Sequence, residues 1–93
     1  EVLNDNEELS DCNLVGPVCE SGDFFAKNIT LPQTKHNDLV AIYSAGAYCF
    51  TMASNYNTRN KVAEIAVENG QDRLIRRRET FEDLIAHEEE FLK

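Results

Sequence analysis

VAEIAVENGQDRLIR, residues 62–76, places two apolar runs on either side of an Asn-Gly pair. Asn69 and Gly70 both tolerate the positive φ angles of a type I′ turn, and such a pair between apolar runs is the strongest short-range signal for a β-hairpin. The stretch therefore predicts two antiparallel strands joined by a tight turn, and it marks the chain as a β protein.

Two further strands are predicted on the N-terminal side of this hairpin. Residues 46–54 alternate in side-chain size, with Tyr48, Phe50 and Met52 on one face, as the period of a strand requires. Residues 39–43 form an apolar run of strand length. We expect this second strand to be buried on both faces.

A helix is predicted on the C-terminal side. Thr80 is a favourable N-cap, Asp83 stands in the position of a capping-box acid, and Phe81, Leu84 and Ile85 recur at helical spacing. Several short strands followed by a helix predict a mainly β fold. We expect an antiparallel β-sandwich or a small Greek-key-like barrel with a C-terminal α-helix, in a single domain over residues 1–93.

The composition limits the classes of partner. Seventeen acidic residues against nine basic ones give a net charge of -8, which repels phosphate backbones and anionic lipids, so we expect no nucleic acid and no membrane. Three cysteines without Cys-x-x-Cys spacing favour a reduced, cytoplasmic setting. His36 and His87 have no companion at metal-ligand spacing, so no metal is expected. The chain begins without methionine and is interpreted as a piece of a longer protein.

The segment GPVCESGD, from Gly16 to Asp23, presents the residues best suited to chemistry. It follows a polar lead-in over residues 1–10, which predicts a surface loop, and a short strand predicted just before the Gly-Pro bend. The negative charge of Glu20 disfavours a thiolate at Cys19, so this thiol suits a proton donor better than a nucleophile. Glu20 itself can bind an ammonium group, and Asp23 can hold the loop through backbone amides.

Each candidate also has a plain structural interpretation. Cys19 can pack as a small buried hydrophobe, and Glu20 can be a solvated surface carboxylate. Tyr48 is either a core tyrosine or a phenol that donates to a phosphate. The basic run at residues 76–78 is better explained by pairing with Glu79, Glu82 and other carboxylates than by an anion site.

Four segments together resemble the C-terminal domain of diaminopimelate decarboxylases. They are VGPVCESGDF at residues 15–24, AGAY at 45–48, MASNYN at 52–57 and LIRRRE at 74–79. The resemblance implies a pyridoxal-phosphate enzyme of the alanine racemase-like fold type, whose N-terminal α/β barrel is absent from this chain. It also implies the conversion of meso-diaminopimelate to L-lysine and carbon dioxide, in a homodimer with shared active sites.

The resemblance assigns a role to three residues of this chain. Cys19 matches the cysteine that returns a proton after carbon dioxide leaves, and Glu20 matches the carboxylate that recognises the distal amino group of the substrate. Tyr48 matches the tyrosine that contacts the cofactor phosphate and lies near the substrate. We expect the chain alone to be inactive, because none of its lysines matches the motif of the cofactor-bonding lysine: Lys27, Lys35, Lys61 and Lys93.

Two alternatives remain at the level of sequence. One is a decarboxylase of the same fold type acting on ornithine, arginine or carboxynorspermidine. Ornithine-type enzymes usually carry aspartate after the reactive cysteine, so Glu20, with the Gly16-Pro17 lead-in, favours diaminopimelate. The other alternative is a non-catalytic module that serves only for dimerisation.

Overall fold

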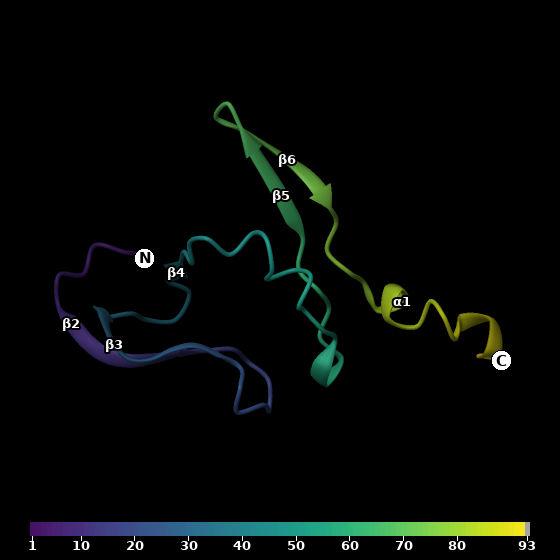
Figure 1. Ribbon diagram of the computed structural model, residues 1–93, viewed down its shortest axis with the longest axis horizontal. Coiled ribbons are helices and arrows are strands. Elements are labelled where there is room, and N and C mark those ends of the chain that lie inside the picture. Colours follow the sequence, from purple (N-terminus) through teal and green to yellow (C-terminus); the bar gives the residue numbers. More distant parts are fainter. Residues whose placement is uncertain (93) are drawn as a thin grey trace. The chain divides into compact units, whose positions relative to one another are not determined.

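The computed structural model describes residues 1–92, so Lys93 lies outside the described residues. The described strands pair into three antiparallel two-stranded sheets (Figure 1). The chain divides into two compact units, Glu1–Ala47 and Tyr48–Lys93. The predicted mainly β, antiparallel class is confirmed, although the described strands do not close into a barrel.

The first sheet of the N-terminal unit pairs β1 (Val2–Leu3) with β4 (Leu39–Val40). Val2 is 8% exposed and is the one buried apolar residue among residues 1–92. The surface loop predicted over residues 1–10 is therefore wrong at its start, and also at its end, where β2 (Leu9–Val15) begins. The strand predicted over residues 39–43 is also too long and is exposed, because its partner β1 offers only two residues for pairing.

The second sheet of this unit is the hairpin of β2 (Leu9–Val15) and β3 (Phe24–Pro32). β2 is longer than the short strand predicted before the Gly-Pro bend. Polar side chains bond across the two strands: Thr30 Oγ1 donates to Asp11 Oδ1 at 2.8 Å. A bulge interrupts the ladder at Asn28, whose φ is 56°, and its amide donates to Asn13 Oδ1 at 2.8 Å. Asparagine tolerates this left-handed conformation better than most residues.

The predicted Asn-Gly hairpin is confirmed in the C-terminal unit. It consists of β5 (Glu64–Glu68) and β6 (Gln71–Arg76), joined by Asn69 and Gly70 with φ angles of 53° and 75°. Both angles are positive, as a type I′ turn requires. At its open end, Arg76 Nε lies 2.6 Å from Glu64 Oε1.

The strand predicted over residues 46–54 is wrong. Most of this stretch forms consecutive turns, in which Met52 N donates to Tyr48 O and Ala53 N donates to Phe50 O, both at 3.0 Å. A 3₁₀ turn, η1 (Tyr56–Thr58), follows. These two amides bond to carbonyls of the same segment rather than to a neighbouring strand, so the alternating side chains do not mark the two faces of a sheet.

The C-terminal helix is confirmed but short. In α1 (Phe81–Leu84) the backbone amide of Thr80 donates to Asp83 Oδ2 at 2.8 Å, and the predicted capping box is complete. A second 3₁₀ turn, η2 (Glu89–Phe91), comes later. Three glutamates at residues 88–90 oppose the dipole of any longer helix, which accounts for its early end.

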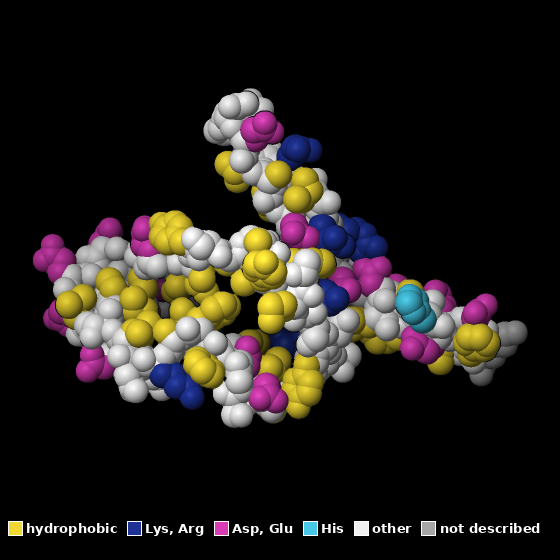
Figure 2. All heavy atoms as spheres, viewed as in Figure 1, with side chains coloured by type: hydrophobic (Ala, Val, Ile, Leu, Met, Phe, Trp, Pro, Cys, Tyr) yellow, Lys and Arg dark blue, Asp and Glu magenta, His cyan; other side chains and the backbone are white. Residues whose placement is uncertain are grey.

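Most large apolar side chains are at the surface. Phe81, Met52 and Val67 are 61%, 79% and 75% exposed, and Figure 2 shows hydrophobic side chains, in yellow, open to solvent on the face in view. Within residues 1–92, no helix has the length and apolar character needed to cross a membrane.

Candidate functional site

The loop that joins β2 to β3 is closed by its own backbone. Gly16 N donates to Asp23 O at 2.9 Å across its neck, and Asp23 N donates to Glu20 O at 3.0 Å. Phe24 N donates to Gly22 O at 2.9 Å where β3 begins. The two strands therefore present residues 17–22 as a defined loop at the end of a hairpin.

Cys19 and Glu20 lie together in this loop, and both are exposed. The exposure of Cys19 does not support the interpretation as a buried hydrophobe. Glu20 Oε1 accepts a hydrogen bond from Gly22 N at 2.9 Å, which fixes one carboxylate oxygen over the loop. A thiol and an oriented carboxylate at the tip of a hairpin can reach a ligand held by another part of a protein.

Asp23 supports the loop, as predicted. Its Oδ2 accepts a hydrogen bond from Val18 N at 3.1 Å. The acceptor reaches back across the loop to the residue directly before Cys19, so a single side chain connects the two ends of the segment.

Tyr48 belongs to the C-terminal unit, whereas Cys19 and Glu20 belong to the N-terminal one. It opens the run of turns described above, and its carbonyl accepts from Thr51 Oγ1 at 3.1 Å. Its side chain is 73% exposed, so the interpretation as a core tyrosine is wrong within this chain. A phenol so exposed can donate to an external acceptor.

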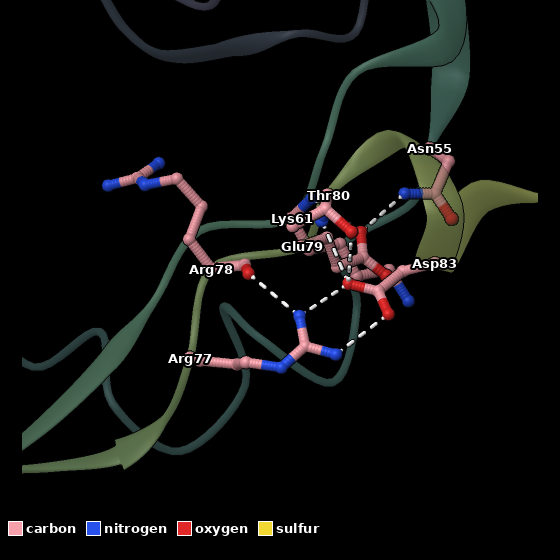
Figure 3. Close-up of polar contacts among 7 residues, drawn as sticks. All are labelled: Asn55, Lys61, Arg77, Arg78, Glu79, Thr80 and Asp83. Carbon is pink, nitrogen blue, oxygen red and sulfur yellow. Dashed lines mark hydrogen bonds and ion pairs between the residues drawn. The ribbon is translucent and has the colours of Figure 1, made fainter.

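A polar cluster at the base of the β5–β6 hairpin escaped prediction (Figure 3). Glu79 Oε1 accepts from Lys61 N at 2.6 Å and from Asn55 Nδ2 at 2.8 Å. Both terminal nitrogens of Arg77 donate hydrogen bonds to the Asp83 carboxylate, at 2.6 and 2.8 Å. The acidic residues at positions 79 and 83 were the only sequence signal for this cluster. Its other members, backbone amides and an asparagine, follow no spacing that would predict it.

The cluster lowers the pKa of both its carboxyl groups. The pKa of Asp83 lies well below its ordinary range, chiefly because of the hydrogen bond from Arg77 and then that from the Thr80 amide. The Lys61 amide and then Asn55 lower the pKa of Glu79. The anionic forms are thus matched by donors already in place, which indicates a structural role for this cluster.

Two arginines of the basic run at residues 76–78 pair with carboxylates, as predicted. Arg76 pairs with Glu64 and Arg77 with Asp83, which belong to the other carboxylates of a prediction that named Glu79 and Glu82. The Arg76 guanidinium also lies 4.1 Å from the centre of the Phe50 ring, a cation–π contact. These two side chains are occupied within the unit and do not form an anion site.

Acid is expected to release the Arg77–Asp83 pair at a pH below the ordinary range of aspartate. A pKa that is lower in the folded chain means that the contribution of Asp83 is fully present above its unfolded pKa of about 3.9 and is lost as the pH falls through the folded value. The side chains of the pair are 64% and 28% exposed, so water screens it and its loss should loosen only the start of α1.

An NMR titration of the Thr80 amide in this chain measures that transition. The Asp83→Asn variant is the control, because it lacks the titrating group and should show no such step. A Thr80 transition centred at or above the ordinary pKa of aspartate would contradict the expectation.

One known family matches the N-terminal unit, which carries the loop, and known proteins match nearly the whole chain. The sequence profile of the family described as "Pyridoxal-dependent decarboxylase, C-terminal sheet domain" matches residues 1–46, which include Cys19 and Glu20. Residues 1–46 of this chain therefore belong to that family. The sheet domain is 62% identical over 90 residues to the diaminopimelate decarboxylase of Campylobacter jejuni, covering 97% of the chain and 22% of that protein. It is 51% identical to the enzyme of Helicobacter pylori over 92% of the chain and 21% of that protein.

Solved structures show the same likeness. The diaminopimelate decarboxylase of Helicobacter pylori, complexed with L-lysine, matches 98% of the sheet domain with a TM-score of 0.87 and 48% identity. That of M. jannaschii matches 89% with a TM-score of 0.83 and 36% identity. The sheet domain covers 23% and 19% of those two chains. It therefore spans about a fifth of the length of its relatives, and the resemblance seen in the sequence is confirmed.

Proposed function

We propose that this sheet domain is the C-terminal domain, residues 1–93, of a pyridoxal-phosphate-dependent diaminopimelate decarboxylase. The enzyme would convert meso-diaminopimelate to L-lysine and carbon dioxide in lysine biosynthesis. The observation that carries the proposal is the 62% identity to a diaminopimelate decarboxylase across nearly the whole chain. The closed loop that exposes Cys19 and Glu20 supports it independently.

The proposed roles follow from the chemistry of each side chain. Pyridoxal phosphate, when bound, supplies the electron sink for decarboxylation. The Cys19 thiol then donates a proton to the carbon that has lost its carboxylate, and Glu20 binds the distal ammonium group of the substrate. Gly22 holds one oxygen of Glu20 at 2.9 Å, which directs the carboxylate before the ligand arrives.

Among the described residues, one side chain suits the phosphate group of the cofactor. Tyr48 offers an exposed phenol that can donate to the phosphate. The ammonium groups of Lys27 and Lys61 lie over the rings of Phe24 and Phe50, at 4.3 and 5.7 Å from their centres. The proposal assigns the rest of the cofactor site, with the lysine that bonds the cofactor, to a barrel domain of the full-length enzyme.

The assembly and location complete the proposal. We propose a homodimer in which the loop at Cys19 reaches into the partner's barrel, so that each active site is shared. An exposed thiol and an exposed carboxylate at the end of a hairpin are placed for such a contact. A cytoplasmic location is proposed because Cys12, Cys19 and Cys49 form no disulfide among the described residues.

Turnover by the full-length enzyme tests the proposal. We expect diaminopimelate to be decarboxylated with a much higher kcat/KM than ornithine, arginine or carboxynorspermidine, whereas this 93-residue chain alone should show no turnover. The two proteins are assayed with added pyridoxal phosphate by release of carbon dioxide and by chromatography of lysine. Preference for another substrate would replace the assignment, and turnover by the isolated chain would contradict the role of the barrel.

A further inference from the structure

The neck of the loop contains a close approach between Gly16 and Asp23. The Asp23 carboxylate occupies the space beside the Gly16 Cα, so a Cβ built on Gly16 would overlap it. The backbones of the same two residues are joined by the 2.9 Å hydrogen bond from Gly16 N to Asp23 O. Any other side chain at position 16 would therefore have to displace the Asp23 carboxylate.

The carboxylate is held in that position from the other side of the loop. Val18 N donates to Asp23 Oδ2 at 3.1 Å, so moving the carboxylate away from residue 16 would break this hydrogen bond. The backbone amide of Asp23 also donates to Glu20 O at 3.0 Å. One residue thus fixes the backbone on both sides of Cys19, at Val18 and at Glu20.

We propose that Gly16 and Asp23 form a steric and hydrogen-bonded lock that positions Cys19 and Glu20 for the reaction, which makes Asp23 a positioning residue. The inference rests on the proposed function, since it concerns the same two side chains. Asp23 acts through the backbone and transfers no proton. Without the lock, the thiol and the recognition carboxylate lose their common orientation, which affects both the proton transfer and the binding of substrate.

Variants of the full-length enzyme test the lock. We expect Asp23→Ala to lower kcat and raise the KM for diaminopimelate together, with a combined loss in kcat/KM of about 10- to 100-fold, the scale of a misplaced reacting group. Asp23→Asn keeps an oxygen that accepts from Val18 N and should restore most of the activity. Gly16→Ala should resemble Asp23→Ala, because the new methyl group displaces the carboxylate.

The double variant separates a lock from two unrelated defects. In Gly16→Ala/Asp23→Ala the methyl group no longer meets a carboxylate, so the loss should equal that of Asp23→Ala alone, well short of the product of the two single losses. Asp11→Ala is the matched control, because it removes another carboxylate hydrogen bond, to Thr30, from the same hairpin. Its kcat and KM should stay within about twofold of wild type.

Cofactor content, read from the pyridoxal absorbance, and the melting temperature are measured for every variant. Unchanged kinetic constants in Asp23→Ala, or multiplicative losses in the double variant, would overturn the lock. So would a loss in Asp23→Ala that is fully explained by unfolding or by lost cofactor, or that Asp23→Asn does not restore. An absence of diaminopimelate turnover in the wild-type enzyme would refute the proposed function instead, and is seen before any variant is made.

Discussion

Replacing Cys19 by alanine in the full-length enzyme is expected to lower kcat for diaminopimelate by about 100- to 10,000-fold, the range typical of a lost general acid. The thiol lies exposed in a loop closed by backbone hydrogen bonds, so its removal should leave the hairpin intact. The KM should change little, because alanine removes a proton donor and leaves the ammonium-binding carboxylate in place. Steady-state kinetics with diaminopimelate measures both constants.

Two controls accompany the Cys19 variant. Cys12→Ala removes a thiol from β2 of the same hairpin and should leave kcat within about twofold of wild type. Cofactor absorbance and the oligomeric state should be unchanged in both variants. An undiminished kcat in Cys19→Ala would favour the alternative in which the domain serves only for assembly.

Replacing Glu20 by glutamine is expected to raise the KM for diaminopimelate and to lower kcat/KM by about 30-fold or more, since removing one member of a desolvated charge pair costs roughly 2 kcal/mol or more. Glutamine keeps an oxygen that can accept from Gly22 N, so the loop should hold its shape while the charge is lost. The effect should therefore fall on recognition of the distal ammonium group.

The exposed Glu68→Gln, at the end of β5, is the matched control and changes the net charge by the same amount. Its KM should match that of the wild-type enzyme. If Glu20→Gln bound diaminopimelate as tightly as wild type, the ammonium group would have to be recognised elsewhere.

Local chemistry made part of the fold predictable. The Asn69-Gly70 hairpin and the capping box of Thr80 and Asp83 were predicted correctly, because each depends on hydrogen bonds or φ angles within a few residues of the chain. The support of the loop by Asp23 was predicted for the same reason. A motif whose hydrogen bonds all lie within a few residues can be predicted without knowing the rest of the fold.

Longer-range features were predicted poorly. The alternation of Tyr48, Phe50 and Met52 resembles that of a strand, but no neighbouring strand in the described residues takes up their backbone groups, and turns form in its place. The pairing of Val2 with Val40 joins segments far apart in sequence and leaves no periodic trace in so short a strand. The period of a sequence shows only which side chains alternate. A strand also needs a neighbouring strand whose backbone groups pair with its own.

In the candidate site, too, local features could be predicted from the sequence and contacts between more distant residues could not. The residues at the loop tip were found from the sequence, since a Gly-Pro bend followed by polar residues presents side chains locally. The lock between Gly16 and Asp23 was not predicted. No sequence pattern indicates that a carboxylate fills the space beside a glycine seven residues away. Roles at Cys19 and Glu20 came from family resemblance, since a thiol beside a carboxylate has several uses.

The near absence of buried apolar side chains has a calorimetric consequence. The heat capacity of unfolding comes mainly from apolar surface that becomes newly hydrated, and among residues 1–92 Val2 is the one apolar residue that is buried. Heating these residues by themselves should therefore release their turns and ion pairs gradually, without a sharp heat-absorption peak. Any cooperative melting of the protein would then originate in the polypeptide that covers these side chains.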